Sequence, residues 1–266
     1  MFDWHVHTHH SPDSQASMSA MARAACVAGL AGVAFTDHVE WMPGNGATGF
    51  LKPPAYFAEL DELQARHNGR LQLLAGLEVG DSHRFPAKTR EIISAWPWDY
   101  ILGSIHWVDG QPGWEPEAFE AGGAVAYARY FDELVALARG GEYDVLAHFD
   151  LVRRDSWAVR QQLLPVEPYA EPLREALRAV VTRGKGLEIN TSAWSVGLDE
   201  PCPGLTILRW YRELGGEVLV FGSDAHHPER VGADFDRARN LALAAGFTRL
   251  ARFEQRRIVG WDTIVP

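Results

Sequence analysis

Along this chain, short apolar runs with the length of β-strands alternate with longer segments that have the apolar spacing of amphipathic helices. The strand-like runs are residues 2–6, 32–38, 71–79, 100–108, 145–150, 186–192 and 217–226. Helical patterns lie between several of them, at residues 18–30, 53–67, 127–141 and 171–184. Repeated strand–helix units predict parallel strands joined by right-handed crossovers. Seven or eight such units in 266 residues favour a barrel of the TIM type over an open doubly wound sheet.

Other segments complete this prediction of one barrel domain over residues 1–266. A last apolar run at residues 248–254 is expected to close or flank the sheet. The segments 39–55 and 109–122 are rich in Gly, Pro and Trp and are expected to form the rim of a cavity. No glycine-rich phosphate loop follows the first strand, so the pattern does not favour a nucleotide-binding fold.

Composition narrows the classes of function. The net charge of −10 argues against a broad basic surface for nucleic acid. No apolar stretch approaches the length of a membrane-spanning helix, and the N-terminus lacks the pattern of a signal peptide. Only Cys26 and Cys202 occur, in no paired motif, which fits a reducing compartment. We therefore expect a cytoplasmic protein with neither a nucleic acid nor a membrane as its partner; its oligomeric state stays open.

Histidines and carboxylates recur at the C-terminal ends of the expected strands. They are His5, His7, Asp37, His38, Glu78, Asp81, His106, His148, Asp150, Asp224 and His226. All C-terminal strand ends of a (β/α) barrel meet on one face, so these residues are expected to become neighbours. Residues two apart in a strand point the same way, so His5 and His7 can bind one ion. Imidazole and carboxylate donors without thiolates suit zinc, iron or manganese.

Each of these residues also has a simpler interpretation when it is taken alone. Histidines near the N-terminus can belong to a disordered start, and His38, His106 and His148 can be buried histidines of the core. Glu78 can pair with an arginine at the end of its strand. The recurrence at one strand end after another nevertheless favours a site for several metal ions.

Six stretches, HVHTHHSPD, FTDH, GLE, SIH, AHFD and FGSDAH, follow one another over residues 5–226. As an ordered set they resemble the PHP family, named for polymerase and histidinol phosphatase. The resemblance implies a distorted (β/α)7 barrel, one strand short of a TIM barrel, that holds three metal ions. By position, the first ion takes His5, His7, Glu78 and Asp224, the second takes Glu78, His106 and His148, and the third takes Asp13, His38 and His226. Some members have a histidine where this chain has Asp13.

Within the family, the layout is closest to the histidinol-phosphatase branch, particularly in AHFDLVRR and LEINTSAW. This similarity implies a metal-dependent phosphomonoesterase that hydrolyses L-histidinol phosphate to L-histidinol and phosphate. Three divalent ions outweigh the charges of Asp13, Glu78 and Asp224, which leaves a positive site for a phosphate dianion. The ions are expected to lower the pKa of a bridging water that attacks phosphorus.

Residues of several kinds are then expected to act on the substrate. These are Glu78, Asp224 and His227 for catalysis, and Arg153, Arg154 and Glu188 for substrate binding, with Asp81 as an alternative to Glu188. The two carboxylates hold ions, and His227 protonates the leaving alcohol. An arginine is expected to bind the phosphate through two parallel N–H groups of its planar, charged guanidinium. A carboxylate at a strand end pairs with the ammonium group or imidazole of histidinol.

One departure from the family bears on the substrate. Relatives in this branch often carry an arginine shortly after an Asn-Thr pair, but this chain has none between Asn190 and Arg209, and Trp194 lies in that stretch. A PHP phosphoesterase acting on a nucleotide, a sugar phosphate or phosphotyrosine therefore stays an alternative. A metal-dependent amidohydrolase is less favoured, because it commonly uses a carboxylated lysine and the strand ends offer no lysine. The intact ligand set argues against a non-catalytic metal-binding module.

Overall fold

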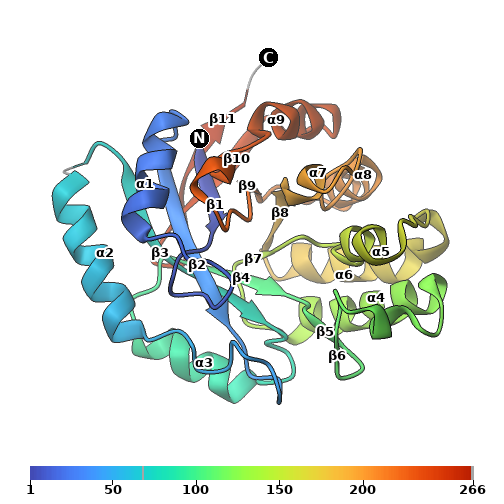
Figure 1. Ribbon diagram of the computed structural model, residues 1–266. Coiled ribbons are helices and arrows are strands. Elements are labelled where there is room, and N and C mark those ends of the chain that lie inside the picture. The colour runs from blue at the N-terminus through green and yellow to red at the C-terminus, as the bar shows by residue number, and fades with distance from the viewer. Residues whose placement is uncertain (68, 265–266) are drawn as a thin grey trace.

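The computed structural model describes residues 1–67 and 69–264, and it contains a nearly closed barrel of parallel strands surrounded by helices (Figure 1). In sheet order the strands are β1 (Phe2–Val6), β2 (Gly32–Val39), β3 (Gln72–Gly80), β4 (Tyr100–Ser104), β7 (Val145–Leu146), β8 (Gly186–Asn190) and β9 (Leu219–Gly222). The edge strands β1 and β9 meet where the N–H of His7 donates to the carbonyl oxygen of Ala225 at 2.9 Å. The prediction of a distorted (β/α)7 barrel is confirmed.

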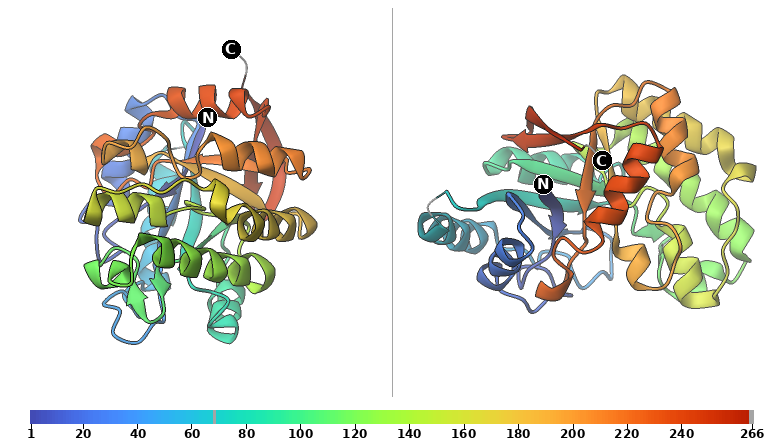
Figure 2. Two further views of the ribbon diagram at one scale, coloured as in Figure 1. Left: turned by 90° about the vertical axis from the view of Figure 1, so that its right-hand side faces the viewer. Right: turned by 90° about the horizontal axis from the view of Figure 1, so that it is seen from above.

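Helices connect the strands and cover the outside of the barrel. They are α1 (Met18–Val27), α2 (Pro53–His67), α3 (Pro86–Ala95), η1 (Pro116–Phe119), α4 (Gly123–Gly140), α5 (Val152–Arg160), η2 (Glu167–Tyr169), α6 (Ala170–Thr182), α7 (Ser192–Ser195), α8 (Leu205–Glu213), η3 (Pro228–Arg230) and α9 (Phe235–Ala244). Helices α4, α6 and α8 pack together on the side of the barrel opposite α1 and α2 (Figure 2). Within residues 1–67 and 69–264, no helix has the length and apolar character needed to cross a membrane.

The end of the barrel where the strands begin is filled by apolar side chains. An antiparallel hairpin of β10 (Arg249–Glu254) and β11 (Arg257–Thr263) covers this end. The ring of Phe253 packs on those of Trp4 and Tyr100, with centroids 5.7 and 5.2 Å apart. The expected strand at residues 248–254 thus flanks the barrel and does not join its sheet.

Four strands end earlier than the sequence predicts. Runs 100–108, 145–150, 186–192 and 217–226 were expected to be extended, but β4, β7, β8 and β9 stop at Ser104, Leu146, Asn190 and Gly222. After β7 and β9 the backbone turns through left-handed conformations, with φ 25° at His148 and 54° at Asp224. These conformations interrupt the ladder and turn the polar residues away from strand geometry. A short hairpin of β5 (Trp107–Val108) and β6 (Gln111–Pro112) follows β4.

Candidate metal centre and active site

The C-terminal ends of the strands surround a cavity of about 740 Å³. Of the residues predicted for the site, those that line this cavity are Asp13, His38, Glu78, His106, His148, Arg154, Asp224, His226 and His227. His5 and His7 are fully buried and lie against the lining carboxylates of Glu78 and Asp224. Residues scattered over more than two hundred positions of the sequence therefore meet at one end of the barrel.

Apolar and aromatic side chains form part of the wall of the cavity. Phe50 and Trp114 come from the segments 39–55 and 109–122, as predicted for these rim loops. Leu151 and Val196 also belong to the apolar part of the lining. A polar floor beneath an apolar wall is typical of pockets that bury a small organic ligand.

Glu78, at the end of β3, lies at the centre of the polar floor and is 1% exposed. Its Oε2 atom is 3.1 to 3.3 Å from ring nitrogens of His5, His7 and His38. Its Oε1 atom is 2.8 Å from Nε2 of His148 and 3.2 Å from Nε2 of His106. The two oxygens of one carboxylate thus face two different groups of imidazoles, which is the arrangement that a bridging ligand requires.

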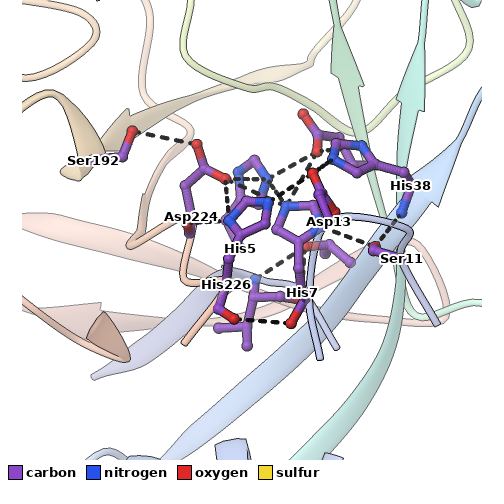
Figure 3. Close-up of polar contacts among 12 residues, drawn as sticks. His5, His7, Ser11, Asp13, His38, Ser192, Asp224 and His226 are labelled. Carbon is purple, nitrogen blue, oxygen red and sulfur yellow. Dashed lines mark hydrogen bonds and ion pairs between the residues drawn. The ribbon is translucent and has the colours of Figure 1, made fainter. Parts of the chain in front are cut away.

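The first cluster consists of His5, His7, Glu78 and Asp224. The Nε2 atoms of His5 and His7 are 3.0 Å apart, and Oδ1 of Asp224 is 3.6 and 3.4 Å from them (Figure 3). Four ligands about 2.1 Å from a tetrahedral zinc ion are separated by about 3.4 Å. The separations of Nε2 of His5 and His7 from each other and from the oxygens of Glu78 and Asp224 therefore match those between ligands of a tetrahedral metal site.

Two further clusters lie beside the first. In the second, Glu78 shares Oε1 with His106 and His148, as described above. In the third, Oδ2 of Asp13 is 3.1 Å from Nε2 of His38 and 3.0 Å from Nε2 of His226. Figure 3 shows Asp13 next to His38, separated from Asp224 by the imidazoles between them. All three clusters have the donor types that zinc, iron and manganese accept.

Two groups of this centre, Glu78 and His7, have protonation states that suit cation binding. Burial alone would raise the pKa of Glu78, but the surrounding imidazoles, first that of His5, hold this pKa well below its usual range. Burial and the neighbouring rings of His226 and His38 lower the pKa of His7 to about 3. Ionised carboxylates and neutral imidazoles are the forms that bind metal ions. Burial would lower the pKa of His5 and His106, but the carboxylates around them raise it well above its usual value, so a bound ion would displace a proton from each of these rings.

Buried atoms without hydrogen-bond partners point to the same conclusion. Among the described residues, Oε2 of Glu78 and Nδ1 of His38 are buried and, although they lie 3.1 Å apart, neither has a partner in hydrogen-bonding geometry. Leaving such atoms unpaired costs about 1–3 kcal/mol each, and a bound cation removes this cost. The residues present therefore fit a group of divalent ions.

The structure corrects the expectation for Glu188. This residue is fully buried inside the barrel and does not line the cavity. Its Oε1 atom is 2.7 Å from Nδ1 of His5, and its Oε2 atom accepts the backbone N–H of His148 at 2.8 Å. A Cβ atom at position 222 would lie 1.8 Å from Oε1 of Glu188, so Gly222 leaves the space that this carboxylate occupies. Glu188 orients His5 and has no access to a substrate.

Asp81, the alternative to Glu188, also lies outside the lining of the cavity. It is fully buried, and burial together with the nearby Glu40 raises its pKa to about 7. Glu40 itself was missed by the sequence analysis, although it follows the TDH motif by two residues. Its Oε1 atom is 2.5 Å from Nδ1 of His106, so it orients that ring in the way that Glu188 orients His5.

The adjacent arginines of α5 point in different directions. The Nη1 atom of Arg154 donates to Oδ2 of Asp224 at 2.9 Å and to Oγ of Ser192 at 2.7 Å, beside the cavity. Arg153 donates to Asp150 at 3.2 Å and lines a separate hollow. Consecutive residues of a helix project about 100° apart, so only one of the two can face the centre. The structure therefore places Arg153 outside the cavity, whereas Arg154 lines it.

Two more side chains from the segment after β9 reach the cavity. His227 is exposed and lines the wall beside His226. Arg230, in η3, lines the same cavity and pairs with Asp234 at 3.2 Å. The sequence did not predict Arg230 as a site residue. It lies in an irregular segment, where no helical or strand periodicity predicts the direction of a side chain.

Residues 3–192 match the family model of the PHP domain. The chain belongs to the PHP family. Among PHP relatives, the histidinol-phosphatase of Lactococcus lactis subsp. lactis is 29% identical over 264 residues, which is 96% of this chain and 95% of that protein. A probable histidinol-phosphatase of Deinococcus radiodurans is 31% identical over 265 residues, covering 96% of this chain and 97% of the relative.

A solved PHP structure has the same architecture over nearly the whole chain. The crystal structure of histidinol phosphate phosphatase from Lactococcus lactis, complexed with Zn, L-histidinol and phosphate, aligns with a TM-score of 0.85 and 27% sequence identity. The alignment covers 97% of this chain and 98% of that one. The similarity supports the barrel and its closure between β1 and β9, because a different topology would not align end to end.

Proposed function

We propose that this PHP protein is a metal-dependent phosphomonoesterase that hydrolyses L-histidinol phosphate to L-histidinol and phosphate. The observation that carries the proposal is the Glu78 carboxylate, which lies between two groups of imidazoles on the floor of a cavity. The names of the relatives above, and the zinc, histidinol and phosphate held by one of them, support the choice of substrate and metal.

The three clusters are the proposed ligand sets for three divalent ions. Such ions supply Lewis-acid stabilisation of the phosphoryl oxygens and a water nucleophile of lowered pKa. Glu78 joins two of the sets, and Glu188 and Glu40 hold the rings of His5 and His106 in the orientation that presents Nε2. Zinc, iron and manganese all fit these donors. We also propose that the protein works in the cytoplasm as a single barrel domain.

Two arginine side chains of the protein orient the phosphate. Arg154 uses Nη1 for Asp224 and Ser192, and its guanidinium has further N–H donors for a phosphate oxygen. Arg230 lies on the same cavity and is 32% exposed, so its side chain can turn toward the ligand. Relatives in the histidinol-phosphatase branch often carry an arginine after the Asn-Thr pair, and this chain lacks it. We propose that Arg230 binds the phosphate in place of that arginine.

The leaving group requires a proton as its bond to phosphorus breaks. His227 lines the cavity and is exposed, so its imidazole can exchange protons with water and deliver one to the alcohol oxygen. The aromatic rings of Phe50 and Trp114 form an apolar wall of the same cavity. The same apolar wall offers a surface for an imidazole ring.

A phosphoesterase acting on another phosphomonoester is the second candidate function. It is favoured by the absence of an arginine between Asn190 and Arg209. Trp194 occupies that stretch, and the guanidinium of Arg237 lies 4.2 Å from the centre of its ring. Neither side chain lines the cavity, so this pair does not replace the missing arginine as a phosphate contact.

A substrate panel distinguishes these candidates. The protein, reconstituted separately with zinc, manganese or iron, is assayed with L-histidinol phosphate, p-nitrophenyl phosphate, a nucleoside monophosphate, a sugar phosphate and phosphotyrosine. We expect the highest kcat/KM for L-histidinol phosphate, and loss of activity with a chelator that is reversed by added metal. A preference for the aryl phosphate or a nucleotide would replace the first candidate with the second. Absence of turnover with every phosphomonoester, at full metal content, would contradict both.

A further inference from the structure

Two of the N-terminal histidines take no part in the clusters described above. His9 and His10 lie three and four residues after the end of β1 at Val6, and both rings lie against Glu59 on α2, outside the lining of the cavity. Nε2 of His9 and Nε2 of His10 are each 3.1 Å from the same atom, Oε2 of Glu59. Three donor atoms thus converge on one point at the surface, outside the proposed catalytic centre.

We propose that His9, His10 and Glu59 form an additional binding site for a divalent cation of the zinc type, separate from the catalytic ions. Two imidazoles and one carboxylate are a donor set that zinc accepts, and water completes its coordination. Magnesium and calcium are disfavoured, because they prefer sites built from oxygen ligands.

The backbone conformation positions both histidine rings toward α2 without a bound ion. His9 and His10 are the two central residues of a turn closed by a hydrogen bond of 2.8 Å from the N–H of Ser11 to the carbonyl oxygen of Thr8. Adjacent residues of an extended strand would point to opposite sides, whereas this turn lets both rings face α2. Thr8 and Ser11 also donate to the buried carboxylate of Asp37, which holds both ends of the turn.

The surroundings of the three side chains are those of a surface metal site. His10 is 9% exposed, and its ring packs edge-on against Tyr56, with centroids 5.4 Å apart. Tyr56 and Glu59 are three residues apart on α2 and therefore lie on the same face of that helix. His9 and Glu59 are 42% and 31% exposed, so water can reach the remaining coordination positions.

An ion at this point would connect the turn to α2. The turn continues into the segment that carries Asp13, and Ser11 accepts the backbone N–H of His38 at 2.9 Å. The added site therefore stabilises the loop that supplies Asp13 to the third cluster. We expect its effect on folding stability to be larger than its effect on turnover, because none of its donors lines the cavity.

Zinc counting in matched variants tests this site. The full-length protein, saturated with Zn²⁺ and freed of unbound metal, is analysed for zinc per chain as wild type, His9→Gln, Glu59→Gln and Glu62→Gln. Glu62 is the control, because it is an exposed carboxylate on the same helix that pairs with Arg66. We expect His9→Gln and Glu59→Gln each to bind one zinc ion fewer than wild type and Glu62→Gln, with phosphatase activity within about twofold of wild type.

Thermal unfolding separates a metal site from a hydrogen-bonded one. Added Zn²⁺ should raise the melting temperature of the metal-loaded wild type and of Glu62→Gln, and should not raise that of the other two variants. Equal zinc content in all four proteins would overturn the proposal. So would a fall in stability of Glu59→Gln that is the same with and without added zinc, which a purely hydrogen-bonding role of Glu59 predicts. Both readouts are independent of which phosphomonoester the enzyme hydrolyses.

Discussion

Replacing Glu188 with Gln tests whether the barrel interior controls the metal centre through His5. The carboxylate serves three donors, which are Nδ1–H of His5 at 2.7 Å, the backbone N–H of His148 at 2.8 Å and Nδ2–H of Asn190 at 3.0 Å. An amide has one oxygen and one NH₂ group in place of the two carboxylate oxygens. The variant therefore cannot satisfy all three donors.

Either orientation of the new amide carries a cost. If its NH₂ group faces Nδ1 of His5, the ring must place its proton on Nε2, the atom that faces the first cluster. If the NH₂ group faces the N–H of His148, two buried donors oppose each other, which costs about 1–3 kcal/mol. Loss of a partner that orients a metal ligand typically lowers affinity about 10- to 100-fold, or about 1.4–2.7 kcal/mol.

We expect Glu188→Gln to bind zinc about 10- to 100-fold more weakly, measured by competition with a chelator, while the barrel remains folded by circular dichroism. The loss of kcat/KM at limiting metal should be equal for L-histidinol phosphate and an aryl phosphate, because Glu188 touches neither. Glu217→Gln, at an exposed carboxylate that pairs with Arg249, is the control and should behave as wild type. Unchanged zinc affinity in Glu188→Gln, or a loss confined to the cationic substrate, would refute this reasoning.

Glu78→Gln removes the negative charge that two clusters share, so this variant should bind at least one metal ion per chain fewer by elemental analysis and should lose orders of magnitude in kcat. Full metal content with near-normal turnover would show that Glu78 does not bridge two ions. Arg154→Ala should lower kcat/KM about 10- to 100-fold for every phosphomonoester, since a charge-assisted contact contributes about 1.5–3 kcal/mol. Arg230→Ala should also lower kcat/KM, and Arg153→Ala should leave kcat/KM nearly unchanged. An effect of Arg153→Ala larger than that of Arg154→Ala would reverse the choice of phosphate-binding arginine.

Much of the centre was predictable from sequence because strand geometry is regular. His5 and His7 are two residues apart, so a strand turns both rings to one side, and their Nε2 atoms lie 3.0 Å apart. The alternation of strands and helices predicts a barrel, and a barrel brings the strand ends together. That logic explains why Glu78 could be expected beside histidines seventy residues farther along the chain, such as His148.

The sequence predicted strand ends and side-chain directions less well where the backbone departs from regular strand or helix geometry. The expected strand around His148 and the one before Asp224 both stop early, because left-handed backbone conformations follow β7 and β9. Arg230 and the turn at His9 and His10 lie in irregular segments, where side-chain direction depends on hydrogen bonds to distant residues. No local period contains that information.

The sequence by itself determined the order of the barrel strands, the family and the residue types that gather at the strand ends, since these depend on local periodicity and on one topology. Only the tertiary structure decided which polar residues face the cavity. It turned Arg154 toward Asp224 and Arg153 away, and it enclosed Glu188 in space left by Gly222. The physical reason is that helix rotation and close packing act between segments far apart in the chain, so a side chain's neighbours are set by the whole barrel.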